Sequence, residues 1–160
     1  MKRRTFILFT LLAFMTKSFA SGKNTNTFKV IKDVYNHLFP TTKNYYGASI
    51  FGAFDFLITI SKHQSFDTTD LKFIINGAEK LLDLDKNFLS LNSTQKEKVL
   101  REFENTNFGQ NWLSTLLYYG FEAMLGDPIY KGNKNMTGWK NINHTAPTPT
   151  ATYPFGKSHE

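Results

Sequence analysis

The chain has 160 residues, of which 41% are hydrophobic and 16% aromatic, with a formal net charge of +6 and no cysteine. This length and apolar content are sufficient for one domain with its own core. The lack of cysteine excludes disulfides, thiolate zinc sites, cysteine-held iron–sulfur clusters and covalently attached haem from this chain.

Residues 1–20 have the parts of an export signal. Lys2, Arg3 and Arg4 form a basic start, residues 7–15 are mostly apolar, and Ala20 ends a cleavage tripeptide of small and aromatic residues. The apolar stretch is too short to cross a bilayer comfortably. The pattern therefore predicts a signal that is cleaved after Ala20 rather than a permanent membrane helix.

Two export routes fit this signal. Arg3 and Arg4 followed by Phe6, with Lys17 before the cleavage site, are similar to a twin-arginine signal, but adjacent arginines also occur in general secretory signals. Residues 1–20 hold four basic and no acidic residues, so their removal lowers the net charge to +2. The basic character belongs largely to the signal and does not indicate nucleic-acid binding.

Apolar residues recur at helical spacing in the first part of the mature chain. The first predicted helix runs from Phe28 to Leu38 and ends before Pro40. A second is predicted over residues 50–60, where apolar residues occupy most faces and indicate a buried position. Asp55 in this helix is expected on its exposed stripe or at a neighbouring cap, with a partner contact as the alternative.

The next two helices are predicted from caps and periodicity. Residues 71–82 match the amphipathic template, and the cap is expected at Thr68, Thr69 or Asp70. A further helix is predicted to begin with Ser93 as its cap. Its core face is expected to hold Val99, Leu100 and Phe103, and its outer face an ion pair between Glu97 and Arg101.

Residues 112–125 form the last strong amphipathic run. Its predicted core side consists of Leu113, Leu116, Leu117, Gly120, Phe121 and Met124. The sequence shows no alternating strand pattern and no internal repeat. We therefore predict an all-α fold, a single compact domain of about five helices over residues 21–143, followed by an extended Thr/Pro-rich tail over residues 144–160.

A long loop with apolar anchors follows this last helix. Asp127 before Pro128 is expected to accept hydrogen bonds from the amides of the following turn. Tyr130 and Trp139 are large anchors that either pack on this chain's own core or bind a partner. Gly132, Asn133 and Gly138 permit positive φ angles in the backbone of this loop.

The residue inventory contains no recognisable catalytic motif. We find no dinucleotide fingerprint, P-loop, nucleophile elbow or His-Glu-x-x-His motif. Asp33–His37 and His63–Asp67 have i,i+4 spacing, but each is interpreted as a solvated pair unless further ligands converge on it. No catalytic, cofactor-binding or metal site is therefore predicted in this chain.

The pattern D-P-x-Y-x-G-N-x-x-x-x-G-W from Asp127 to Trp139 resembles the C-terminal signature of the gluconate 2-dehydrogenase subunit 3 family. The Leu38–Pro40 segment and residues 48–57 are also similar to family elements. Many members carry Y-G-G-N in the loop, where this chain has Lys131 in place of the first glycine. If that position is left-handed, Lys131 is strained there.

The resemblance implies a non-catalytic small subunit of a periplasmic flavin-dependent dehydrogenase for sugars, sugar acids or polyols. A large partner subunit would hold FAD, and a cytochrome subunit would hold c-type haem. The small subunit would assist maturation and export of the large one, and would associate with the membrane only through the complex. We expect the partner to be bound by residues of this loop, namely Asp127, Pro128, Tyr130, Gly132, Asn133, Gly138 and Trp139.

Two other interpretations remain open at this stage. A stand-alone periplasmic helical ligand-binding protein would require a closed apolar pocket. A small hydrolase would require titratable groups that converge in a cleft.

Overall fold

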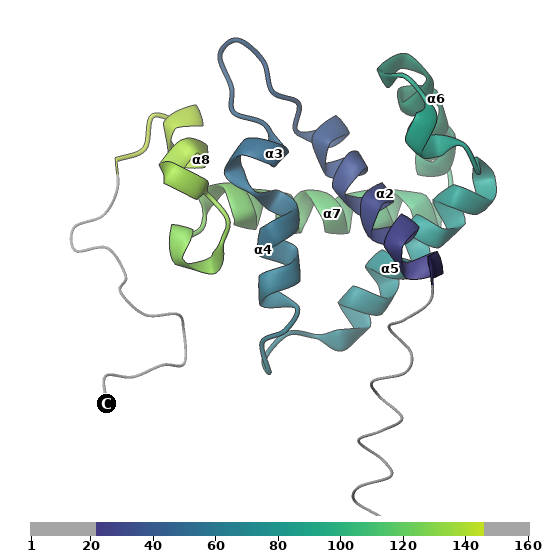
Figure 1. Cartoon of the computed structure of the whole chain (residues 1–160), viewed down its shortest axis with the longest axis horizontal. Helices are drawn as coiled ribbons and strands as arrows, with labels where there is room; N and C mark the ends of the chain where they lie inside the picture. The colour runs from purple at the N-terminus through teal and green to yellow at the C-terminus, as the bar shows by residue number, and fades with distance from the viewer. Residues whose placement is uncertain (1–21, 146–160) are drawn as a thin grey trace, which may run out of the picture.

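The computed structural model describes residues 22–145 as a set of packed helices (Figure 1). Within this range there are seven α-helices and no strand, which confirms the all-α fold and exceeds the predicted five helices. The α-helices are α2 (Gly22–Leu38), α3 (Ala48–Phe51), α4 (Ala53–Ile60), α5 (Thr68–Leu84), α6 (Ser93–Glu104), α7 (Asn107–Leu125) and α8 (Thr137–Asn141). Short 3₁₀ turns lie at η1 (Phe88–Ser90), η2 (Pro128–Tyr130) and η3 (Lys134–Met136).

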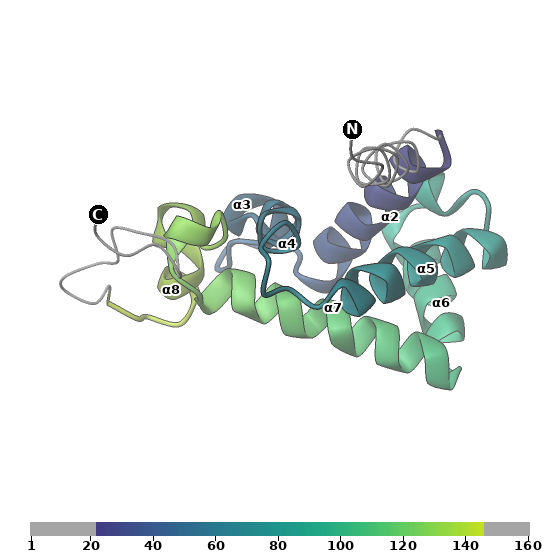
Figure 2. The same cartoon turned by 90° about the horizontal axis from the view of Figure 1, so that it is seen from below.

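Helix α7 organises the whole domain. It runs along one side of the molecule, with α5 and α6 towards its N-terminal half and α3, α4 and α8 towards its C-terminal half (Figure 2). It contacts each of the other described α-helices. Only a helix that is apolar on several faces can serve as such a platform, because each packed neighbour must bury apolar surface against it.

Helices α5 and α7 approach each other closely in the core. Trp112 is fully buried, and its Nε1–H donates to the Ile74 carbonyl at 2.9 Å. A Cβ added at Gly77 would lie 2.0 Å from the Trp112 ring, so only glycine fits there. This small residue lets the indole lie against the α5 backbone.

The α3–α4 region and the helix caps differ from the sequence predictions. Gly52 has φ +86° and divides the predicted helix over residues 50–60 into α3 and α4. Asp67, not a residue from 68 to 70, caps α5 by accepting from the Thr69 amide. Asn92, not Ser93, caps α6 in a reciprocal capping box with Gln95.

The core face of α7 also differs from the prediction. Phe121 is 48% exposed, whereas Tyr119 and Ala123 are buried. The periodicity was ambiguous because α7 carries apolar residues on more than one face. The exposed apolar residues on the second face line the candidate site described below.

Two predicted segments lie largely beyond residues 22–145. The export signal, with Arg3, Arg4, Phe6 and Ala20, and residues 146–160 of the predicted tail lie outside the described residues. Between residues 22 and 145, no helix combines the length and apolar character needed to cross a lipid bilayer.

Candidate partner-binding site

The loop after α7 begins as the sequence predicts. Asp127 precedes η2, and its Oδ1 accepts a hydrogen bond from the Ile129 amide at 3.0 Å. Pro128 occupies the first position of the turn, where its missing N–H leaves no donor unsatisfied. The chain therefore turns sharply at the end of α7 and returns along it.

Asn133 connects the two ends of this loop. It is fully buried, and its Nδ2 donates to the Gly126 carbonyl at 2.9 Å. Its Oδ1 accepts from the amides of Gly138 at 2.9 Å and Trp139 at 3.3 Å. Its φ is 45°, a positive value of the kind that asparagine permits. The sequence did not reveal that its side chain joins the end of α7 to the start of α8.

Trp139 packs on its own chain. Its side chain is 5% exposed, and its Nε1–H donates to the Leu125 carbonyl at 2.7 Å. The His144 ring lies against the indole with a centroid separation of 5.3 Å. Of the two roles considered for this anchor, self-packing is the one that the geometry shows.

Gly132 and Gly138 do not adopt the positive φ angles that glycine permits. Among the described glycines only Gly52 has a positive φ. The two loop glycines instead permit close approach to α7, because an added Cβ would lie 2.5 Å from the Ala123 carbonyl oxygen at Gly132 and 1.9 Å from that of Met124 at Gly138. The backbone of the loop is thus pressed directly onto α7.

The segment from Lys131 to Met136 is conformationally strained. Lys131, Asn133, Asn135 and Met136 have φ angles of 72°, 45°, 54° and 57°, in the left-handed region. Each non-glycine residue there costs on the order of 1 kcal/mol, less for Asn. The backbone of Lys131 is in the left-handed region, at a position where many family members have glycine. Lysine is therefore strained there, as expected if this position is left-handed. Buried contacts of Asn133 and Trp139 offset this cost.

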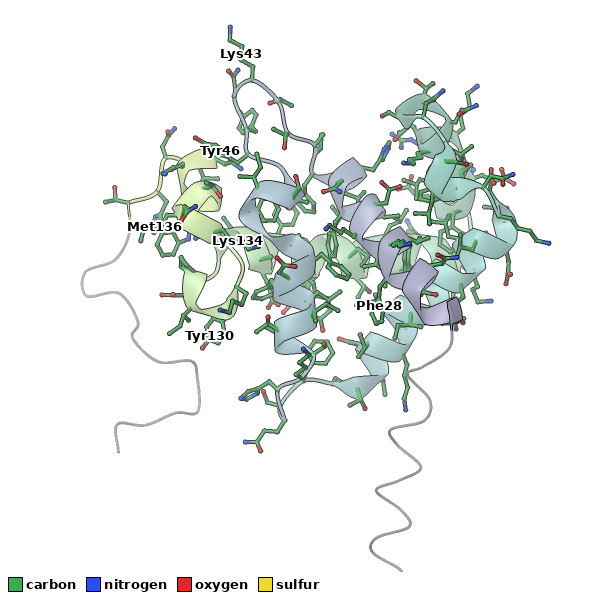
Figure 3. The ribbon with its side chains drawn as sticks, in the orientation of Figure 1. Phe28, Lys43, Tyr46, Tyr130, Lys134 and Met136 are labelled. Atoms are coloured by element: carbon green, nitrogen blue, oxygen red, sulfur yellow. The ribbon has the colours of Figure 1, made fainter. Side chains whose placement is uncertain are left out.

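The folded-back loop forms one wall of an open groove. We define the α4–α7 groove as two adjoining hollows of about 630 and 430 Å³ that share Ile60, Tyr118, Glu122 and Tyr130. The first also includes Phe56, Phe121, Leu125, Gly126 and Asp127; the second also includes Thr59, His63, Ser65, Phe66, Asp67, Tyr119 and Ile129. Figure 3 shows Tyr130 on the loop, beside the C-terminal end of α4.

Large apolar side chains on α7 are exposed along this groove. Tyr118, Phe121 and Leu125 are 58%, 48% and 43% exposed and lie at helical positions i, i+3 and i+7. A contiguous exposed apolar stripe of this kind is typical of an interaction surface. Sequence reasoning missed it, although the excess of apolar residues around α7 was the available signal.

Hydrogen bonds hold the tyrosines of the groove. The Tyr118 hydroxyl is hydrogen-bonded to the Glu122 carboxylate, which raises the pKa of Tyr118. The Tyr119 hydroxyl donates to Asp70 at 2.5 Å. Burial, followed by this bond to Asp70, raises the pKa of Tyr119. Both phenols are therefore neutral donors at physiological pH.

The other charged candidates form separate pairs. Asp55 is exposed and forms an ion pair with Lys134, which projects from η3 towards α4 (Figure 3). His37 Nε2 lies 2.7 Å from Glu97, and Asp33 lies 2.7 Å from Lys96, so the predicted Asp33–His37 pair is replaced by two contacts to α6. His63 bonds to Ser65. No group of three metal-ligating side chains occurs among residues 22–145.

These features define a helical protein with an open, aromatic-lined groove between α4 and α7. The family model described as gluconate 2-dehydrogenase subunit 3 matches residues 25–146. This chain belongs to that family, which is named for a subunit of a dehydrogenase complex. No curated protein and no solved structure gives a significant match.

Proposed function

We propose that this chain is the non-catalytic small subunit of a periplasmic flavin-dependent dehydrogenase that oxidises a sugar, sugar acid or polyol. Its large partner subunit would hold FAD, and a c-type cytochrome subunit would accept the electrons. The family membership supports a subunit role. The exposed groove supports an interaction surface, because tyrosine and phenylalanine are enriched at the centres of protein interfaces.

The observation that carries this proposal is the exposed stripe of Tyr118, Phe121 and Leu125 beside an open groove. Burial of the exposed half of each side chain by a partner would contribute roughly 1 kcal/mol, because full burial of a large apolar side chain is worth about 1.5–3 kcal/mol. The loop from Asp127 to Trp139 contributes by shaping the groove, with Tyr130 as its contacting side chain. Trp139 is buried beneath the loop, and its hydrogen bond to the Leu125 carbonyl stabilises the loop against α7.

The second candidate is a stand-alone periplasmic ligand-binding protein. The groove has the volume for a small ligand, since its larger hollow measures about 630 Å³. It is open along its length and lined by exposed side chains, whereas small ligands are generally enclosed. A protein segment therefore fits this surface better.

Purification of the tagged chain from its own host tests the proposal. We expect a flavoprotein to co-elute in equal stoichiometry, identified by its flavin absorbance and by mass spectrometry. A double variant, Tyr118→Ser with Leu125→Ser, should lose most of the bound flavoprotein while remaining folded.

The matched control changes two exposed leucines elsewhere. Leu84 and Leu89 are 43% and 36% exposed and lie outside the groove. Leu84→Ser with Leu89→Ser should retain the flavoprotein. A folded, colourless monomer from the unmodified chain would refute the subunit proposal and redirect the search to a small ligand.

A further inference from the structure

The α4–α7 groove is acidic, although the chain as a whole has a positive net charge. The whole sequence has 19 Lys and Arg against 13 Asp and Glu, and residues 21–160 have 15 against 13. The groove lining nevertheless contains Asp67, Glu122 and Asp127 and no lysine or arginine, with His63 as its one basic side chain. The surface therefore attracts a partner segment of positive charge.

Glu122 is the carboxylate best placed for this contact. It lies on the wall common to both hollows and in the middle of the exposed stripe of α7. Asp127 and Asp67 already accept from backbone amides at the starts of η2 and α5. Glu122 is bonded to the Tyr118 hydroxyl. A carboxylate has two oxygens and about four acceptor sites, so this bond leaves room for a bidentate donor.

The surroundings of Glu122 match a guanidinium better than an ammonium. Tyr118 is 58% exposed, and Tyr130 borders the same two hollows. A planar guanidinium can stack on an aromatic ring while it donates two parallel bonds to a carboxylate, which an ammonium cannot do. The apolar side chains Phe56, Ile60 and Leu125 provide contacts for aliphatic or aromatic neighbours of such an arginine.

We infer that the groove receives an apolar segment of the partner subunit that carries an arginine, with its guanidinium paired to Glu122 and stacked on Tyr118. This inference rests on the proposed function for the identity of the partner. The chemistry of the segment follows from the groove itself.

Charge variants of the purified complex test the inference. Glu122→Lys should weaken association with the flavoprotein by about 100-fold, because like charges would face each other in the groove. Glu122→Gln should weaken it by roughly 5-fold. The wild-type complex should also dissociate more readily as salt is raised. Glu102→Lys, which makes the same charge change on exposed α6 outside the groove, should have no effect.

A defined probe decides the inference even if no flavoprotein co-purifies. The purified protein is titrated with an acetylated Leu-Leu-Arg-Leu-Phe amide and with the same peptide carrying citrulline, and binding is followed by amide-resolved NMR. The arginine peptide should shift the resonances around Tyr118 and Glu122 and bind at least about 5-fold more tightly than the neutral isostere. Glu122→Gln should remove this preference.

The outcomes separate the two proposals. Equal perturbation by both peptides, or by neither, overturns the arginine inference whatever the complex shows. Retention of the flavoprotein by Glu122→Lys also overturns it while leaving the subunit role intact. Failure of the unmodified chain to capture a flavoprotein counts against the subunit role alone.

Discussion

At the scale of single residues, the Asn133 side chain stabilises the loop after α7. It donates a hydrogen bond to the Gly126 carbonyl and accepts hydrogen bonds from the amides of Gly138 and Trp139. Asn133→Asp keeps the size and the tolerance for positive φ but replaces the donor with an oxygen facing the Gly126 carbonyl. We expect a loss of about 2–4 kcal/mol in the free energy of unfolding at neutral pH, measured by urea denaturation.

The control for this substitution is Asn111→Asp. Asn111 is an exposed residue in the N-terminal half of α7, so the same charge is added without loss of a buried bond. Its effect should remain within about 0.5 kcal/mol. A similar small effect at position 133 would contradict the role assigned to Asn133.

A substitution at Lys131, in contrast, is expected to stabilise the protein. Its φ of 72° is unfavourable for lysine, and its side chain is exposed. Lys131→Gly should stabilise the protein by about 0.5–1 kcal/mol, the strain relieved less the extra entropy that glycine loses on folding. Thermal unfolding measures this change. In the same assay Lys140→Gly in α8, where the backbone is helical, should destabilise the protein by about 0.5–1 kcal/mol.

At the scale of elements, α2 and α6 are joined by a hydrogen bond between His37 and Glu97 and by an ion pair between Asp33 and Lys96. The bond from His37, with that from Arg101, lowers the pKa of Glu97 below its usual 4.5. Because the lowered pKa belongs to the folded state, the stabilisation is complete above pH 4.5 and is lost as the pH falls through the folded pKa. Glu97 is well exposed, so its contribution is below about 1 kcal/mol.

A pH series of unfolding experiments checks this contribution. The wild-type protein should be more stable than Glu97→Gln at pH 6, and the difference should shrink as the pH falls below 4.5. Glu102→Gln, on the exposed face of the same helix, controls for the removal of a charge. A difference between wild type and Glu97→Gln that grows on acidification would reverse the assigned sign.

At the scale of the whole molecule, the predicted export signal bears on how the chain would reach its proposed partner. The twin-arginine interpretation of residues 3 and 4 implies export in the folded state. Replacing both Arg3 and Arg4 by Lys should leave unprocessed chain in the cytoplasm. Cell fractionation followed by immunoblotting measures this. Unchanged export of the variant would favour the general secretory route, for which two lysines serve as well as two arginines.

The groove of α4 and α7 is complete within this chain, but any substrate chemistry belongs to the proposed large subunit. The ion-pair and loop variants above alter stability, whereas the groove variants alter association. Measuring unfolding and co-purification on every variant keeps these two effects apart.

The sequence by itself determined the helical class, most helix bodies, the turn at Asp127–Pro128 and the family. These follow from local periodicity, from the fixed φ of proline and from a motif contiguous in the chain. The sequence could not locate the division of α3 from α4, the two faces of α7, or the hub formed by Asn133. These features depend on which segments meet in the folded chain. Gly132 and Gly138 must be glycine because the loop backbone lies directly against α7. Phe121 is exposed because α4 and the loop leave a groove beside it.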